Sequence, residues 1–250
     1  MSGFSLDWLA LREGADDRAR NAGLRGAFLD ALPGSPTVID LGSGTGSTAR
    51  ALEIEGARWV LTDDDPALLT EAARRLPGAI TLQADLAEDI ETVLSREADA
   101  ITASALFDLV SEEWIERFAR AAGGRIVYGA LTYDGTEAWE PEHPADLAVA
   151  RAFDAHQRRD KGFGPACGPM GASVLARALE AEGYAVTLAP SPWRLNRAQD
   201  GALMDTLAEG VAAAAMEAGG GAAEAQDWLS ARRSAIRCTI GHLDLLAVRA

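Results

Sequence analysis

The fold is decided by residues 37–50, which read TVIDLGSGTGSTAR. The apolar residues before the first glycine predict a buried parallel strand, and the residues from Ser47 to Leu52 predict the start of a helix. Glycines are needed between the two because the chain must bend sharply and let a ligand approach its backbone. A helix that starts at such a turn presents unpaired N–H groups to that ligand. The stretch therefore predicts a nucleotide-binding turn in an α/β protein.

The spacing of the glycines narrows this prediction. Gly42, Gly44 and Gly46 alternate with other residues, whereas a dinucleotide-binding fingerprint has its third glycine three positions after its second. With Asp40 they form Asp-x-Gly-x-Gly-x-Gly, which resembles motif I of the class I S-adenosylmethionine-dependent methyltransferases. The resemblance implies an α/β fold with a doubly wound, mostly parallel seven-stranded sheet, and S-adenosylmethionine as cofactor. It also implies that Asp40 helps to hold the amino group of the cofactor's methionine part.

Acidic residues close the next two predicted strands. The second strand runs into Asp63, Asp64 and Asp65, and the third ends at Asp85. Open α/β sheets bind ligands at the carboxyl ends of their strands, and an acid about 20 residues after the turn suits ribose hydroxyls. The resemblance places Asp63, with its neighbour Asp64, at the ribose, and Asp85 with the backbone of Leu86 at the adenine. Asp65 is better explained as the N-cap of the following helix.

The segment after the fourth predicted strand indicates the type of acceptor. By resemblance, Ser104 to Asp108 is where the transferred methyl group meets its acceptor. Enzymes that methylate amino groups of nucleic acids or of protein glutamine carry Asn/Asp-Pro-Pro-aromatic there, and cytosine-C5 enzymes carry Pro-Cys; this chain has neither. We therefore expect a small-molecule acceptor, with Ser104 bordering both cofactor and acceptor and Phe107 contacting the acceptor.

Residues 133–170, after a fifth strand predicted at 124–132, depart from a minimal domain of this kind. A helix predicted over 145–159 is followed by a run rich in glycine and proline, which favours a binding loop or lid. The candidate acceptor-binding residues in this segment are Phe153, Arg159, Lys161 and Phe163. His156 is the candidate general base or orienting group, on one helix face with Asp160. The alternative is a histidine that bonds Asp160 at a helix end, beside solvated cations.

Helical segments are predicted at two further places. Residues 1–36 form an N-terminal helical cap, and 37–250 form the methyltransferase domain with a helical insertion at 196–236. The charged stretch 12–20 is a solvated helix face or a helix break at Gly14, or else it is the source of an arginine, Arg20, that closes over an anionic substrate or the cofactor carboxylate. The Ala-rich insertion fits either a cap over the acceptor pocket or the surface of a homodimer.

Composition excludes several classes of function. A formal net charge of -15 and a pI near 4.6 argue against a binder of duplex nucleic acid. The two cysteines lack metal-site spacing, which predicts free thiols in a reducing compartment and no metal site. The sequence shows neither a signal-peptide pattern nor the run of ~18 apolar residues that a membrane helix needs, so we expect a cytoplasmic protein without a membrane partner.

The sequence thus predicts an enzyme that transfers a methyl group from S-adenosylmethionine to an O or N nucleophile of a small metabolite. In one interpretation this metabolite carries an anionic group. Three alternatives stay open. An NAD-dependent oxidoreductase is disfavoured by Ser47 and the adenine-type Asp85. An aminopropyltransferase would need a more acidic pocket after the fourth strand than Asp108 supplies. The third is a non-catalytic scaffold that binds S-adenosylmethionine.

Overall fold

Eight β-strands form one sheet within residues 4–249, the part of the chain that the computed structural model describes. They are β1 Thr37–Leu41, β2 Arg58–Asp63, β3 Ile80–Gln83, β4 Ala100–Ser104, β5 Ile126–Glu140, β6 Tyr184–Pro190, β7 Trp193–Asn196 and β8 Arg237–Arg249. The order is β3-β2-β1-β4-β5-β8-β6, with β7 also paired to β8. β8 runs antiparallel to β5, β6 and β7, and β1 to β5 are parallel.

The predicted doubly wound, mostly parallel α/β sheet is confirmed, with eight strands in place of seven. The additional strand is β7, which two residues separate from the end of β6. Ser191 and Pro192 interrupt the edge strand there, and the chain then pairs again with the first residues of β8. Residues 1–3 and 250, at the ends of two predicted domain ranges, lie outside the described residues.

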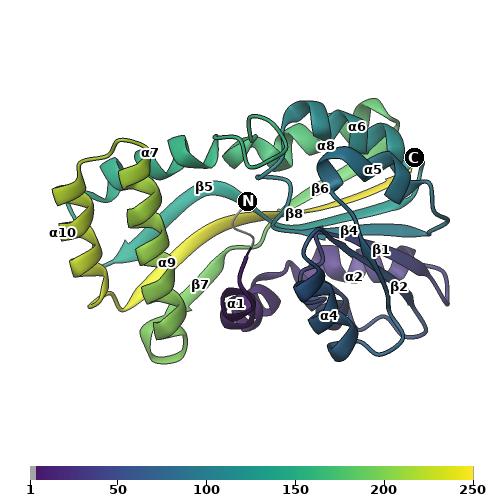
Figure 1. The fold of residues 1–250 in the computed structure, drawn as a ribbon, viewed down its shortest axis with the longest axis horizontal. Helices are drawn as coiled ribbons and strands as arrows, with labels where there is room; N and C mark the ends of the chain where they lie inside the picture. The colour runs from purple at the N-terminus through teal and green to yellow at the C-terminus, as the bar shows by residue number, and fades with distance from the viewer. Residues whose placement is uncertain (1–3, 250) are drawn as a thin grey trace.

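Helices cover both faces of the sheet (Figure 1). Their bounds are α1 Leu6–Ala19, α2 Ala22–Ala31, α3 Ser47–Leu52, α4 Pro66–Arg75, α5 Leu86–Leu94, α6 Glu112–Ala122, α7 Asp146–Gln157, α8 Gly171–Ala181, α9 Arg197–Glu217 and α10 Ala222–Arg232. Helices α5, α6 and α8 pack on one face, and α2, α3 and α4 on the other. None of the helices in the described part of the chain is long and apolar enough to cross a membrane.

Both faces of the central strands are buried, which explains their nearly continuous apolar sequence. Successive side chains of a strand point to opposite faces. Ile39 and Leu41 of β1 therefore belong to the core with α5, α6 and α8, whereas Val38 belongs to the core with α2, α3 and α4. This packing fixes β1 between its neighbours, so the glycine turn that follows it lies at the centre of the sheet's carboxyl edge.

A third core lies beside the main sheet, in a part of the molecule that we call the extension: β7, the paired ends of β5 and β8 beyond Thr132, α7, α9 and α10 (Figure 1). Its centre holds large side chains from strands and helices together. The rings of Trp139 and Trp228 meet edge to face with centroids 5.8 Å apart, and Met204 is fully buried nearby. The extension therefore has a core of its own.

The predicted end of the fifth strand at residue 132 is wrong, because β5 continues to Glu140 as the backbone of the extension. Its pairing with β8 shifts register between Gly129 and Thr132 and again between Tyr133 and Glu137. Such bulges bend a strand without ending it. The sequence Asp134-Gly135-Thr136 resembles a turn in isolation but forms one of these bulges.

The N-terminal helical segment breaks between α1 and α2 and not at Gly14, which was one of the alternatives for this stretch. Gly14 stays helical where Arg12 and Asp16, one turn apart, form an ion pair across it. The break falls at Asn21, whose side chain caps α2 by accepting the N–H of Leu24 at 3.1 Å. This corner turns α1 across the carboxyl edge of the sheet.

Candidate functional site

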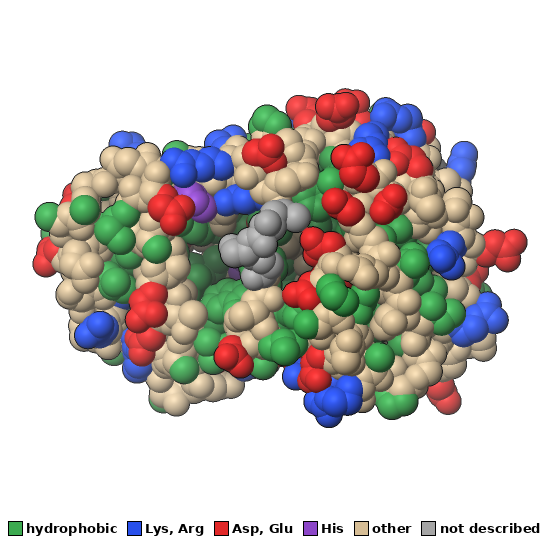
Figure 2. Space-filling model, in the orientation of Figure 1, with side chains coloured by type: hydrophobic (Ala, Val, Ile, Leu, Met, Phe, Trp, Pro, Cys, Tyr) green, Lys and Arg blue, Asp and Glu red, His purple; other side chains and the backbone are tan. Residues whose placement is uncertain are grey.

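A cavity of about 1000 Å³ lies at the carboxyl ends of β1 to β4, between the main sheet and the extension. Figure 2 shows the molecule hollowed at this place. One end of the cavity is lined by the glycine turn and by the acids that follow β2 and β3, and the other by α1 and the segment after α7. A ligand in this cavity would contact both the main sheet and its additions.

The glycine turn has the backbone conformation that its residues predict. Gly42, Gly44 and Gly46 all have positive φ, at 59°, 53° and 78°, which only glycine adopts without strain. A Cβ on Gly46 would lie 2.7 Å from Leu76 Cδ1, and one on Gly44 would lie 3.1 Å from Leu9 Cδ1. Gly42 and Gly44 line the cavity, whereas Gly46 packs against the end of α4 and does not line it.

The structure brings four of the other predicted cofactor residues to the same end of the cavity: Asp63, Asp64, Asp85 and Leu86. The Asp63 carboxylate accepts the N–H of Gly44 at 2.8 Å and that of Asp65 at 3.0 Å, so it ties the glycine turn to the end of β2. Burial raises the pKa of Asp63, although these two N–H groups oppose the shift. Asp85 and Asp65 are the N-caps of α5 and α4.

Asp40 lies beneath the turn and does not line the cavity. It is fully buried, and its Oδ1 accepts the hydroxyl of Thr102 at 2.7 Å. Its Oδ2 has no hydrogen-bond partner within residues 4–249. Burial raises the pKa of Asp40 from 3.8 to about 7, and the nearby charge of Arg20 opposes this shift.

This shift predicts that folding stability depends on pH through Asp40. The folded state binds the proton more tightly than the unfolded chain, so stability is unaffected below about pH 4 and falls as the pH rises from 4 towards 7. The variant Asp40→Asn removes this titration. Urea unfolding at pH 5 and pH 8 should show a smaller loss of unfolding free energy in the variant than in the wild type. Two results would contradict the assignment. One is an equal loss of unfolding free energy in the wild type and in Asp40→Asn. The other is that Asp30→Asn, a control at an exposed position, reduces this loss as much as Asp40→Asn does.

Arg20 lies against the wall of the cavity with much of its guanidinium unused. The residue is 7% exposed, and Nη2 lies 3.4 Å from Thr48 Oγ1 and 3.5 Å from Ser104 Oγ. Thr48 and Ser104 both line the cavity. Nε and Nη1 of Arg20 have no partner in the described part of the chain. A buried guanidinium that lacks partners is costly, which points to an anionic group of a ligand at this place.

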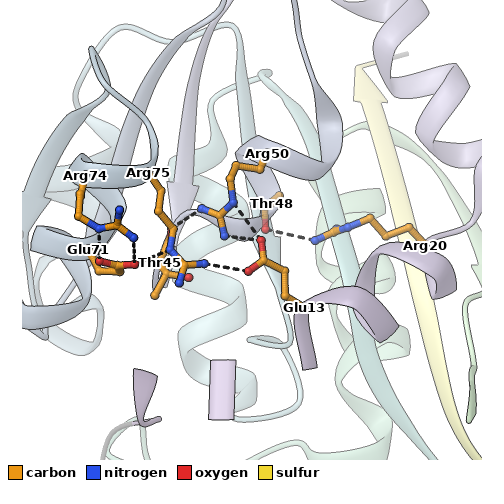
Figure 3. Close-up of polar contacts among 8 residues, drawn as sticks. All are labelled: Glu13, Arg20, Thr45, Thr48, Arg50, Glu71, Arg74 and Arg75. Carbon is orange, nitrogen blue, oxygen red and sulfur yellow. Dashed lines mark hydrogen bonds and ion pairs between the residues drawn. The ribbon is translucent and has the colours of Figure 1, made fainter. Parts of the chain in front are cut away.

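Helix α1 is anchored over the glycine turn by a network of charged side chains (Figure 3). Glu13 accepts hydrogen bonds from Arg50 of α3 and, at 3.0 Å, from Arg75 of α4. Arg75 in turn pairs with Glu71. These contacts hold α1 where Arg12, Asp16 and other residues of this helix line the cavity.

The far end of the cavity is formed mainly by the residues that follow α7. Gln157, Asp160, Lys161, Gly162 and Phe163 line it, opposite Arg12 and Asp16. The ring of Phe163 meets Trp114 edge to face at 5.7 Å, which fixes this segment to α6. Two of the predicted acceptor residues, Lys161 and Phe163, are therefore in the cavity.

Besides Arg20, which lies behind the cavity wall, four predicted acceptor-site residues do not line the cavity: Phe107, Phe153, His156 and Arg159. Phe107 is buried against Phe118, and Phe153 packs on Tyr133 in the extension. Arg159 donates to the backbone carbonyl of Glu217 at 2.7 Å. These side chains face the protein and not the space that a ligand would fill.

The predicted pairing of His156 with Asp160 is wrong, because α7 ends at Gln157 and Asp160 lies beyond the helix. The Asp160 carboxylate instead accepts the N–H groups of Gly162 and Gly164, at 2.6 and 3.0 Å. His156 lies between Glu217 and Lys161, with its Nε2 3.2 Å from Glu217 Oε2.

Sequence reasoning missed several residues that line the cavity, among them Arg12, Asp16, Thr45, Thr48 and Gln157. The spacing of Arg12 and Asp16 was an available signal, since charges four residues apart on a helix pair. Their pair is bidentate, at 2.8 and 3.1 Å, and the guanidinium of Arg12 stacks 5.0 Å from the ring centroid of Trp193. Trp193 lies in β7, which was not predicted, so this wall of the cavity could not be assembled from the sequence.

The order of the strands, with one reversed strand beside the edge, and the cavity at the glycine turn together define the class I methyltransferase fold. A sequence model of the family described as "Methyltransferase domain" matches residues 38–124, from β1 to the end of α6. Residues 38–124 therefore form a methyltransferase domain, of the class that uses S-adenosylmethionine as cofactor, and the fold of the described residues agrees with this match.

Solved structures show the same fold at low sequence identity. A cyclopropane-fatty-acyl-phospholipid synthase-like protein from Lactobacillus casei is 12% identical with a TM-score of 0.56, over 94% of this chain and 98% of that one. The YcgJ protein from Bacillus subtilis is 13% identical with a TM-score of 0.53, over 92% of this chain and 100% of that one. The BH2331 protein from Bacillus halodurans is 13% identical with a TM-score of 0.51, over 89% of this chain and 96% of that one. No curated protein matches the sequence.

Proposed function

We propose that this methyltransferase acts on an oxygen or nitrogen nucleophile of a small-molecule acceptor, which binds between α1 and the segment that follows α7. The observation that carries the proposal is the shape of the cavity. It continues from the glycine turn and the acids after β2 and β3 to Lys161 and Phe163, so a cofactor and a second small molecule would have adjoining places in one open cavity.

The residues at the cofactor end suit S-adenosylmethionine. Asp63 and Asp64 would accept the ribose hydroxyls, while Asp85 and the backbone of Leu86 would hold the adenine. The buried guanidinium of Arg20, which has two nitrogens without partners, suits the carboxylate of the methionine part. Asp40, beneath the turn, would act on the amino group through the backbone or water and not by lining the cavity.

When bound, the cofactor supplies a methyl group that its sulfonium already activates. The chain therefore needs mainly to position the acceptor and to exclude water, because orientation alone removes a large part of the barrier of such a step. Rigid elements surround the place of transfer: β4 with Ser104 on one side, and α1, anchored through Glu13, on the other.

The variant Arg20→Gln tests where the carboxylate of the cofactor lies. Losing a charge-assisted hydrogen bond should weaken S-adenosylhomocysteine binding by about 1.5–3 kcal/mol, measured by calorimetric titration. The affinity for 5′-methylthioadenosine, which lacks the amino acid part, should stay unchanged.

Arg18→Gln is the matched control, since Arg18 lies in the last turn of α1, two residues before Arg20, but pairs with Asp200, and neither residue of this pair lines the cavity. It should bind both compounds as the wild type does. If Arg20→Gln weakened the two compounds equally, Arg20 would act on the fold of the site and not on the carboxylate.

A further inference from the structure

The chain has a single lysine, Lys161, and the structure places it on the wall of the cavity. Its Nζ lies 3.3 Å from Nδ1 of His156, and Nε2 of the same ring lies 3.2 Å from Glu217 Oε2. The three side chains thus form a line from the end of α9, through α7, to the cavity. His156 and Glu217 themselves do not line it.

The hydrogen-bond roles of Lys161, His156 and Glu217 follow from the chemistry of their side chains. A lysine ammonium can only donate hydrogen bonds, and a carboxylate can only accept them. His156 therefore accepts from Lys161 at Nδ1 and donates its Nε2–H to Glu217, which requires a neutral imidazole. Burial and the charge of Lys161 lower the pKa of His156, which favours this neutral form.

Lys161 lies near charged residues, but no carboxylate among the described residues is in contact with its ammonium group. Arg159, Glu217 and Asp108 face it from the loop, from α9 and from the segment after β4. Within residues 4–249, no carboxylate lies within 4.0 Å of its nitrogen. The nearest carboxylate in sequence, Asp160, is occupied by the N–H groups of Gly162 and Gly164. The ammonium therefore has hydrogens left to donate.

We infer that Lys161 recognises an anionic group, a carboxylate or a phosphate, on the methyl acceptor, and that His156 and Glu217 are positioning residues that hold its ammonium at the cavity. The inference rests on the proposed function, since it concerns the acceptor end of the same cavity. It also gives His156 a part that does not require contact with the acceptor. A flexible lysine side chain loses less entropy on binding when a partner already holds it.

Because no other lysine is present, an amine-reactive anion can report on Lys161 directly. The probe is pyridoxal 5′-phosphate, whose aldehyde condenses with the amine and releases water; borohydride then reduces the imine. 5-Deoxypyridoxal, which lacks the phosphate and has no 5′-hydroxyl to close onto its aldehyde, is the counterpart without the anionic group. Mass spectrometry of the peptide that contains Lys161 gives the labelling rate with each compound. We expect a rate at least about tenfold higher with the phosphate, because a charged site raises the local concentration of its counter-ion.

His156→Ala should reduce this preference several-fold, because the ammonium is no longer held towards the cavity. His143→Ala is the matched control: His143 lies in the loop before α7, contacts Asp227, and does not line the cavity. It should leave the preference unchanged. Inorganic phosphate should slow labelling by the phosphorylated aldehyde more than labelling by 5-deoxypyridoxal.

Equal labelling rates for the two aldehydes, or a preference that His156→Ala leaves intact, would overturn the inference. Calorimetric titration with S-adenosylhomocysteine on the same samples separates this result from a failure of the proposed function. Binding of the cofactor product with equal labelling rates overturns the role of Lys161 alone. If the wild type does not bind S-adenosylhomocysteine, the proposed function is overturned, whatever the labelling rates are.

Discussion

Replacing Asp63 by asparagine is expected to raise the Kd for S-adenosylmethionine about 10- to 100-fold, which corresponds to ~1.4–2.8 kcal/mol. The Asp63 carboxylate accepts the N–H groups of Gly44 and Asp65 and lines the cavity. The two N–H groups bond different oxygens of the carboxylate, and an amide keeps only one of them, so its NH₂ would face a donor. The glycine turn would lose its tie to β2, and the ribose would lose a charged acceptor. Calorimetric titration at constant pH measures the change.

Asp64→Asn is the companion variant, because Asp64 also lines the cavity but is exposed and makes no side-chain hydrogen bond to the turn. It should weaken binding less than Asp63→Asn. An unchanged Kd in Asp63→Asn would mean that the ribose lies elsewhere and that the turn does not depend on this carboxylate.

Replacing Asp244 by alanine is expected to cost about 3 kcal/mol of unfolding free energy or more, since each buried donor left without a partner costs ~1–3 kcal/mol. Asp244 is fully buried in β8 and accepts hydrogen bonds from the backbone N–H of Leu131, the hydroxyl of Tyr128 and the backbone N–H of Asn21. Its carboxylate thus joins β8 to β5 and to the start of α2. Urea unfolding followed by circular dichroism gives the difference.

The control for this variant is Asp227→Ala, whose side chain is 79% exposed. Surface changes of this kind stay within ~0.5 kcal/mol. If Asp244→Ala unfolded at the same urea concentration as the wild type, the three donors would have to find other partners, and the carboxylate would not be the link between β8, β5 and α2.

The parts of the fold that depend on local pattern could be predicted from the sequence. The strand before the glycine turn, the turn itself and the helix after it are specified by adjacent residues, and so are the N-caps Asp65 and Ser111. Helix α9, which begins at Arg197 and ends at Glu217, lies within the helical insertion predicted at 196–236. Residues that follow successive strands then meet at one edge, because parallel strands share their direction. Asp63 and Asp85 were placed in this way.

The extension could not be predicted, because its strands are defined by partners that are distant in sequence. The residues of β7 pair with the beginning of β8, 41 to 47 positions away along the chain, and four residues between a turn and a helix give no periodic signal. The end of β5 likewise looks like a loop until β8 pairs with it across two bulges.

The misplaced acceptor residues have the same cause. Phe153 and His156 share a helix with Gln157, and the sequence cannot say which side of that helix faces the cavity. The aromatic partner Tyr133 and the acidic partner Glu217 both come from elements that the extension brings together. Arg20 was found because it lies in the only charged stretch close before the glycine turn, although its contacts with Thr48 and Ser104 are visible only in the structure.

Calorimetric titration of the purified protein with S-adenosylmethionine, S-adenosylhomocysteine and NAD tests the central claim most directly. We predict micromolar binding of the first two compounds, in a one-to-one ratio, and no binding of NAD. Binding of NAD without binding of S-adenosylmethionine or S-adenosylhomocysteine would contradict the account of the site, because the glycine turn and the acids after β2 and β3 would then serve a different cofactor.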